Sequence, residues 1–233
     1  MIKLVLFDLD GTLLPMDQEV FGKAYFSGLS QKLAPFGYEP KALVGGILEG
    51  TKAMVLNDGS CTNEEAFWKR FEAIFGAQVR EQEPIFRDFY AKEFQLAKDA
   101  CGYDKRAKEV ISAIKEKGLR VVLATNPIFP AIATESRIRW AGLSPEDFEL
   151  YTTYENSHFC KPNPKYYLEI LEKVGVSSEE CLMVGNDVTE DMVAETLGMQ
   201  VFLLTDCMIN KDEKDISGYP QGSFEELRNY LGI

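Results

Sequence analysis

Short apolar runs alternate with amphipathic segments over much of the chain, a pattern typical of strands that alternate with helices. Segments of the length of buried strands lie at residues 4–7, 120–124, 148–152, 181–184 and 201–204. Segments with helical spacing separate the last four runs, and these segments end at glycines such as Gly142. The alternation predicts a doubly wound, Rossmann-like parallel sheet in an α/β fold, with helices on both faces. We expect the first strand to be central and the strand order to be 5-4-1-2-3. The polar segment 206–222 is expected to be a long loop.

Residues 15–102 have a different pattern, without strand-like runs. Apolar residues recur there at helical intervals, for example at Phe21 and Tyr25, and again over 67–75 and 86–97. We interpret these series as the buried faces of about four helices and not as a cofactor site. The predicted organisation is a core of residues 1–14 and 103–233, with residues 15–102 as an inserted helical domain.

Composition and charge narrow the class of partner. The formal net charge of −12 on 233 residues argues against binding to nucleic acid or to an anionic membrane surface. No apolar run approaches the ~20 residues of a membrane-spanning helix. The first residues have strand character and not the character of a secretion signal, so a cytoplasmic location is expected. The five cysteines have no CxxC spacing, as in a protein with reduced thiols. No pattern points to a particular oligomeric state.

Polar residues follow several of the predicted strands. The carboxyl ends of parallel strands share one edge of a sheet, where α/β proteins bind ligands, so we expect these residues to converge. They are Asp8, Asp10, Gly11 and Thr12 after the first strand, Thr125 and Asn126 after the second, Lys161 after the third, and Asn186, Asp187 and Asp191 after the fourth.

These residue types predict phosphoryl chemistry with a divalent cation. Asp8 and Asp10 are expected to point to the same side of an extended chain, because strand side chains alternate. Two such charges need a cation or a shared proton between them. Mg²⁺ prefers carboxylate, carbonyl and water oxygens, and Asp187 is placed to supply a third carboxylate. Once the metal neutralises a bound phosphate, a carboxylate can attack phosphorus. Thr125 can donate a hydrogen bond to a phosphoryl oxygen, and Lys161 supplies positive charge.

The same residues resemble the motifs of the haloacid dehalogenase-like (HAD) hydrolase superfamily. The sequence Asp-Leu-Asp-Gly-Thr at 8–12, after an apolar strand, resembles the specific first motif. Thr125, Lys161 and the Gly-Asn-Asp at 185–187 resemble the second, third and fourth motifs. The resemblance implies that Asp8 is the nucleophile and forms an aspartyl-phosphate. It also implies that Asp10 protonates the leaving alcohol and then deprotonates water.

The resemblance further implies a ligand set for Mg²⁺, made of Asp8, the main-chain carbonyl of Asp10 and the fourth-motif acid. The fourth motif departs from the family pattern, since Asn186 stands where an acid often follows the glycine. The spacing of Asp187 and Asp191 still fits a variant of the motif, so Asp187 is the expected ligand and Asn186 a further candidate. Asp191 is expected to orient Lys161 or a metal-bound water.

Phosphate binding is expected to involve Gly11, Thr12, Thr125, Asn126 and Lys161. The inserted helices resemble the C1 type of cap, a lid that closes over the site and selects the substrate. The expected function is a Mg²⁺-dependent phosphatase that acts on a small phosphorylated metabolite.

Four other functions compete with this one. The dehalogenases of the family lack the second aspartate, so Asp10 favours phosphoryl transfer. A phosphomutase or a phosphonate hydrolase on the same core stays open; the latter needs a Schiff-base lysine, and the inserted segment has lysines at 23, 32, 41 and 52. A non-catalytic phosphate-binding regulatory protein is disfavoured, because every chemical group of the motifs is present.

Overall fold

The central strand of the sheet is β1 (Leu4–Phe7), whose four residues are fully buried. In the computed structural model, which describes residues 1–233, β1 pairs in parallel with β2 (Arg120–Leu123) and β4 (Cys181–Gly185). The sheet order is β3-β2-β1-β4-β5-β6, with every pair parallel. Strands β3 (Leu150–Tyr151) and β5 (Gln200–Leu204) occupy the predicted places. The structure thus confirms the predicted parallel sheet and the order of its first five strands.

The sixth strand was not predicted. β6 (Gln221–Gly222) lies at the end of the segment that was expected to be a long loop, and its backbone pairs with β5. A strand of only two residues is too short to show an apolar alternation. Its position is set by backbone hydrogen bonds to β5. The chain then ends in α8 (Phe224–Leu231), which begins at a capping box of Ser223 and Glu226.

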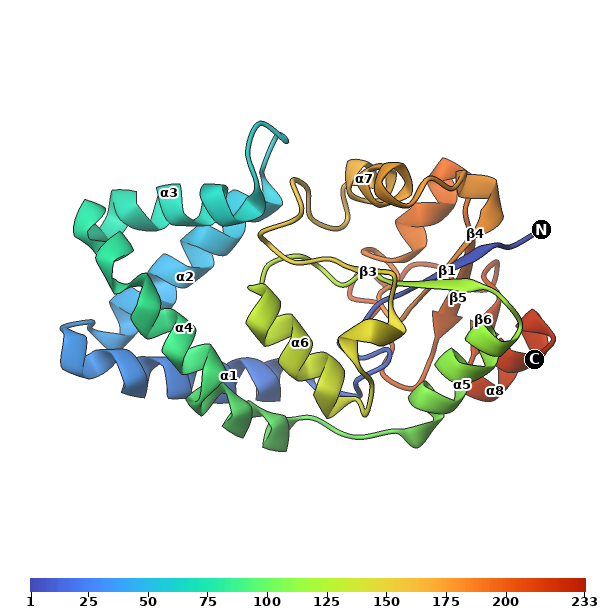
Figure 1. Cartoon of the computed structure of the whole chain (residues 1–233), viewed down its shortest axis with the longest axis horizontal. Coiled ribbons are helices and arrows are strands. Elements are labelled where there is room, and N and C mark those ends of the chain that lie inside the picture. The colour runs from blue at the N-terminus through green and yellow to red at the C-terminus, as the bar shows by residue number, and fades with distance from the viewer.

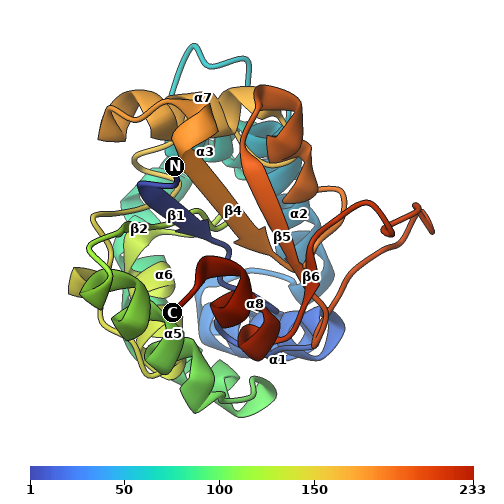
Figure 2. The ribbon, with the colours of Figure 1, turned by 90° about the vertical axis from the view of Figure 1, so that its right-hand side faces the viewer.

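Helices cover both faces of the sheet (Figure 2). Val5 and Phe7 of β1 belong to the core under α5 (Lys105–Glu116) and α8, whereas Leu4 and Leu6 belong to the core under α7 (Pro164–Val174). This alternation is the two-residue period of a strand that is buried on both sides. Short 3₁₀ helices lie in the connections of the core: η4 (Pro145–Asp147), η5 (Ser178–Glu180) and η6 (Met192–Leu197).

The inserted segment, residues 15–102, is largely helical, as expected. Its helices are α1 (Gln18–Leu33), η1 (Ala34–Phe36), α2 (Pro40–Val55), α3 (Asn63–Phe75), η2 (Ala77–Gln82), α4 (Glu83–Ala91) and η3 (Glu93–Ala100). The apolar series over 86–97 is divided between α4 and η3, because Lys92 leaves the helical conformation at φ −119° and ψ −81°. Helix α2 packs closely on α3 at Gly50, where a Cβ would lie 2.5 Å from the ring of Phe67.

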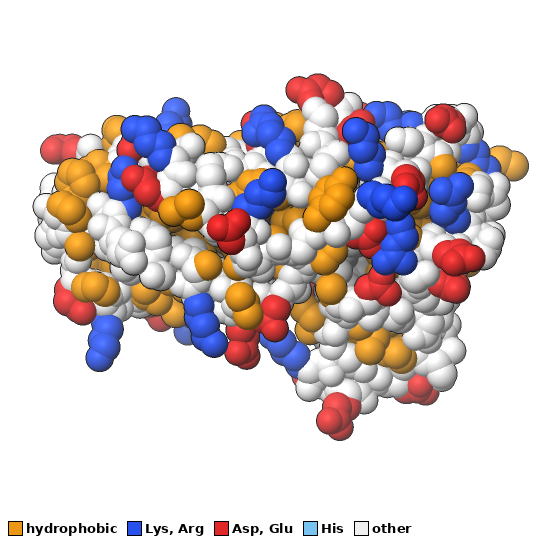
Figure 3. All heavy atoms as spheres, turned by 90° about the horizontal axis from the view of Figure 1, so that it is seen from below, with side chains coloured by type: hydrophobic (Ala, Val, Ile, Leu, Met, Phe, Trp, Pro, Cys, Tyr) orange, Lys and Arg blue, Asp and Glu red, His pale blue; other side chains and the backbone are white.

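The inserted helices and the sheet lie at opposite ends of the molecule, with α6 (Ala131–Trp140) between them (Figure 1). The two connections to the inserted helices run side by side. Met16 and Cys101 form an antiparallel bridge, and the Gly102 N–H donates to the Pro15 carbonyl at 2.7 Å. No helix has the length and apolar character required to cross a bilayer. Acidic and basic side chains are interspersed on the face shown in Figure 3.

Candidate active site

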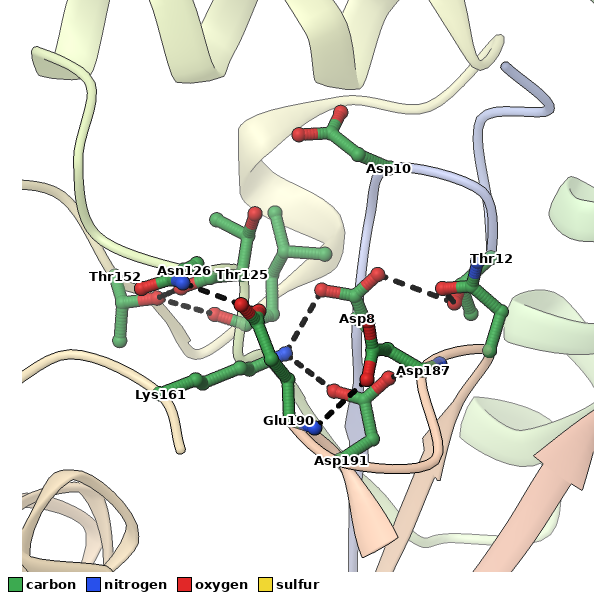
Figure 4. A network of polar contacts seen from close by, with 12 residues as sticks. Asp8, Asp10, Thr12, Thr125, Asn126, Thr152, Lys161, Asp187, Glu190 and Asp191 are labelled. Atoms are coloured by element: carbon green, nitrogen blue, oxygen red, sulfur yellow. Dashed lines mark hydrogen bonds and ion pairs between the residues drawn. The ribbon is translucent and has the colours of Figure 1, made fainter. Parts of the chain in front are cut away.

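Asp8 lies directly after β1 and is buried. Its Oδ1 accepts a hydrogen bond from Lys161 Nζ at 2.8 Å. Its Oδ2 lies 3.2 Å from the Thr12 hydroxyl (Figure 4). The Thr12 Oγ1 lies 3.1 Å from Asn186 Oδ1 as well, so the hydroxyl links the first and fourth motifs. Both carboxylate oxygens of Asp8 are therefore held in fixed directions.

Lys161 is fully enclosed, with 1% of its surface exposed, and joins two carboxylates. Its Nζ lies 2.8 Å from Asp8 and 2.6 Å from Asp191. Burial alone would lower the pKa of Lys161, but the charges of Asp191 and Asp8 outweigh it and raise the pKa well above its ordinary value. Lys161 is therefore a permanent cation beside Asp8. Burial raises the pKa of Asp191 to about 6, although Lys161 opposes the rise.

The turn after Asp8 depends on Gly11, which has a φ of +86°. A Cβ at this position would lie 2.3 Å from Asn186 Nδ2, so only glycine permits the close approach to the fourth motif. The Gly11 N–H donates to the Leu14 carbonyl at 2.8 Å and the Thr12 N–H to the Leu9 carbonyl at 3.2 Å. The main-chain donors of both residues are thus used within the turn.

Asp10 faces away from Asp8 and takes a different partner. The expected common direction of the two side chains does not occur, because β1 ends at Phe7 and the chain turns from Leu9 onward. Figure 4 shows the Asp10 carboxylate directed away from the Lys161 cluster. Its Oδ2 accepts a hydrogen bond from Arg137 Nη1 on α6.

Arg137 is buried, with 1% of its surface exposed, and was not among the predicted site residues. Its guanidinium carbon lies 4.5 Å from the ring centroid of Phe129. The other carboxylate oxygen of Asp10, Oδ1, is buried and has no hydrogen-bond partner. Burial raises the pKa of Asp10 although Arg137 opposes the rise. A sequence signal exists for Arg137: it lies at i+4 from Ala133 and i−3 from Trp140, within the buried face of a helix, where an arginine requires a partner.

Thr125 and Asn126 follow β2 and approach the cluster from the other side. The Thr125 carbonyl accepts hydrogen bonds from the Thr152 hydroxyl at 2.6 Å and the Tyr166 hydroxyl at 2.8 Å. Its own hydroxyl makes no hydrogen bond within the protein, and Thr125 lines the same cavity as Asp8. Asn126 Nδ2 donates to Glu190 at 3.1 Å, and Asn126 Oδ1 is buried without a partner.

Glu190 is a second residue that the sequence analysis missed. It lines the same cavity as Asp8 and Asp10, one position before Asp191. Burial raises its pKa to about 7; Lys161 opposes this, and Asp191 and Asp187 add to it. The single histidine, His158, lies outside this group and pairs with Glu169 at 2.8 Å.

The oxygen atoms near Asp8 fit a hard divalent cation. Asp8, Asp10, Asn186 and Asp187 all line one cavity. Asp187 Oδ1 accepts the N–H groups of Thr189 and Glu190 at 2.8 and 2.9 Å, which leaves Oδ2 without a partner. The carboxylates of Asp8 and Asp187, the Asp10 carbonyl and the Asn186 amide oxygen are the kinds of ligand that Mg²⁺ takes. The side chains do not by themselves form a cluster of three acidic or histidine ligands.

Asp191 takes a place distinct from these oxygens. Its Oδ1 contacts Lys161, and its Oδ2 accepts the Asp187 N–H at 2.9 Å. It therefore holds both the lysine and the loop that carries Asp187.

Comparison with known proteins places this geometry in a family. A model of the haloacid dehalogenase-like hydrolase family matches residues 2–194. A Bacillus subtilis (strain 168) protein named "Putative phosphatase YhcW" is 25% identical over 206 residues, covering 88% of this chain and 84% of its own.

Three solved structures share the fold. The structure of "the putative HAD-hydrolase YfnB from Bacillus subtilis bound to magnesium" has a TM-score of 0.58 and 18% identity, with 100% of this chain and 99% of its own covered. A 2-haloacid dehalogenase of Pseudomonas syringae has a TM-score of 0.64 and 19% identity, with 100% and 99% covered. A HAD phosphatase of Thermococcus onnurineus also has this fold, with a TM-score of 0.58 and 20% identity over 99% of this chain and 98% of its own, so phosphatases and a dehalogenase share it.

Proposed function

Because the chain belongs to the haloacid dehalogenase-like hydrolase family, we propose that it is a Mg²⁺-dependent phosphatase that hydrolyses a small phosphorylated metabolite through an aspartyl-phosphate on Asp8. The observation that carries the proposal is the separation of two carboxylates in one cavity. Asp8 pairs with Lys161, and Asp10 pairs with Arg137 while one of its oxygens stays free. The name of the YhcW relative supports the activity, and the magnesium in YfnB supports the metal.

The first half-reaction forms a bond between an Asp8 oxygen and phosphorus and breaks the bond from phosphorus to the alcohol oxygen. Asp10 gives its proton to that oxygen as it leaves. The Thr125 hydroxyl and the Lys161 ammonium stabilise negative charge on the phosphoryl oxygens. Mg²⁺, held by Asp8, the Asp10 carbonyl and Asp187, would neutralise phosphate charge that otherwise repels the nucleophile.

The second half-reaction regenerates the enzyme. Asp10 takes a proton from water, whose oxygen attacks phosphorus, and the bond between phosphorus and Asp8 breaks to release inorganic phosphate. The Asp191 carboxylate keeps Lys161 beside Asp8 throughout. A positioned acid and base of this kind contributes roughly 10²–10⁴-fold to the rate.

In this proposal residues 15–102 form a helical cap on a core of residues 1–14 and 103–233. The paired connections at Met16 and Cys101 form a natural boundary. A cavity runs from the Asp8 cluster to side chains of α1, α3 and α4, which supports a role for the cap in selecting the substrate.

The placement of the lysines argues against a phosphonate hydrolase. No lysine is among the residues that line the cavity, and Lys32 is paired with Asp88 and Glu93. A Schiff base to a bound substrate requires an accessible amine in the cavity.

The proposal is tested by turnover of p-nitrophenyl phosphate with the purified protein. We expect phosphate release with Mg²⁺, none after EDTA treatment, and none from a folded Asp8→Asn variant. Chloride release from 2-chloropropionate is the comparison reaction. Turnover that survives EDTA or Asp8→Asn, or release of chloride in place of phosphate, would show that the assignment is wrong.

A further inference from the structure

The cavity is much larger than a phosphate group requires. It has a volume of about 640 Å³ and continues from Asp8 and Asp10 to the side chains of α1, α3 and α4. Ligand pockets in proteins commonly have volumes of roughly 300–1,000 Å³. The part of the cavity beyond the carboxylates therefore has room for the alcohol portion of an ester. The side chains that line this part determine which alcohol fits.

Aromatic side chains dominate these walls. Phe21 and Tyr25 of α1, Trp68 of α3 and Phe86 of α4 line the cavity, together with Phe129 before α6. The rings hold one another in edge-on contacts. The centroids of Trp68 and Phe86 are 5.6 Å apart, and those of Tyr25 and Phe129 are 5.4 Å apart. Rings fixed in this way offer a preformed apolar surface, which favours an aromatic or otherwise apolar ligand.

The charged side chains of the same walls oppose a second anion. Glu64, Glu83 and Glu155 line the cavity, and the exposed Arg87 is the one lysine or arginine among the lining residues. Burial, with the nearby charges of Glu155 and Glu83, raises the pKa of Glu64. The two buried cations of the active site are already paired with aspartates. A carboxylate or second phosphate on the alcohol would therefore meet mainly negative charge.

From these walls we infer the substrate class: the monophosphate ester of an uncharged alcohol with an aromatic body, and not an ester that carries a second anionic group. The inference rests on the proposed phosphatase function for the identity of the reacting group. Its basis is separate, since it depends on the aromatic and acidic walls and not on the residues around Asp8.

The test measures binding without turnover. Three phosphonates present the same anionic head. Methylphosphonate has no aromatic ring, benzylphosphonate has a neutral ring, and 4-carboxybenzylphosphonate has a ring that carries a negative charge. Calorimetry on the wild-type protein with Mg²⁺ should show benzylphosphonate binding about tenfold or more tightly than methylphosphonate, because the ring is buried. The carboxylated compound should bind about tenfold more weakly than benzylphosphonate. Equal binding of all three, tighter binding of the carboxylated compound, or no binding by any would overturn the inference.

Charge exclusion is tested separately by Glu64→Gln. This variant should narrow the affinity ratio between the neutral and the carboxylated phosphonate, whereas Glu116→Gln, an exposed residue outside the cavity, should leave the ratio unchanged. An unchanged affinity ratio in Glu64→Gln would show that Glu64 does not exclude the anionic compound.

Failure of the proposed function would give a different result. If the phosphonates rank as expected but benzyl phosphate is not hydrolysed, the phosphatase assignment is wrong and the specificity of the cavity stands.

Discussion

Arg137 and Asp10 form an ion pair in which the arginine, from α6, binds only one of the two carboxylate oxygens of the aspartate. Arg137 is 1% exposed, whereas the Asp10 side chain is 22% exposed and lines the cavity. The pair thus fixes the direction of Asp10 and leaves its Oδ1 for a proton. Helix α6 carries no residue of the four family motifs. Through this ion pair it is nevertheless joined to the first motif.

Loss of Arg137 should destabilise the protein. Arg137→Met leaves a largely buried Asp10 carboxylate without its partner, and we expect the free energy of unfolding to fall by about 2–3 kcal/mol. Urea denaturation followed by circular dichroism measures the change. Arg139→Met on the same helix, with an exposed pair to Glu135, should cost less than about 1 kcal/mol. The double variant Arg137→Met with Asp10→Asn should recover part of the loss; no recovery would argue that Arg137 acts through packing alone.

The two aspartates should differ in how substitution affects different esters. Asp10→Asn removes general acid help, which matters most for a poor leaving group, so an alkyl phosphate should lose on the order of 10²–10⁴-fold in kcat. With p-nitrophenyl phosphate the loss should be much smaller, and phosphate should accumulate on Asp8 because water is no longer deprotonated. Asp8→Asn should abolish turnover of both esters. Rapid-quench assays measure these quantities, and equal losses for Asp10→Asn on the two esters would contradict its acid–base role.

Metal dependence should separate Asp187 from Asp191. Asp187 lines the cavity and has one carboxylate oxygen without a hydrogen bond, whereas both oxygens of Asp191 are bonded, to Lys161 and to the Asp187 N–H. Asp191 is expected to act on the metal only through its neighbours, and loss of such a partner typically weakens metal binding by about 10–100-fold. Asp187→Ala removes a proposed direct ligand, so it should raise the Mg²⁺ concentration for half-maximal activity more than Asp191→Ala does. Titration of activity with Mg²⁺ decides the order, and the reverse order would make Asp191 the ligand.

Glu190 should make the stability of the metal-free protein depend on pH. Burial raises its pKa from an ordinary 4.5 to about 7, so between these values the folded state binds more protons than the unfolded state. The stability contributed by protonated Glu190 is therefore complete below pH 4.5 and is lost as the pH rises through 7.

Glu190→Gln keeps an oxygen that accepts the Asn126 hydrogen bond but removes this titration. In EDTA, the unfolding free energy of the variant minus that of wild type should increase by about 1–3 kcal/mol between pH 4.5 and pH 8, because only wild type loses stability over this range. Urea denaturation at a series of pH values measures the difference. Glu116→Gln, an exposed substitution, serves as the control. A difference between Glu190→Gln and wild type that does not change with pH would show that Glu190 titrates normally.

The sequence by itself determined the sheet and the positions of the motifs. Runs such as 4–7 and 181–184 are apolar throughout because their strands are buried on both faces, and this property can be read without a structure. One strand before the inserted helices and four after them led to the predicted order 5-4-1-2-3, which the structure confirms for these five strands. The placement of Asp8, Thr125, Lys161 and Asp187 near one edge follows in turn, because parallel strands end on the same side of the sheet.

Only the tertiary structure decided the directions of the side chains and their partners. The strand period failed for Asp10 because β1 ends three residues earlier, and the turn that follows sends its carboxylate to α6. Arg137 is 127 positions away from Asp10, so no local pattern connects them. The two-residue β6 was likewise set by a neighbouring strand. Local sequence encodes burial through periodicity, whereas contacts between distant segments depend on how helices and turns pack, which periodicity does not encode.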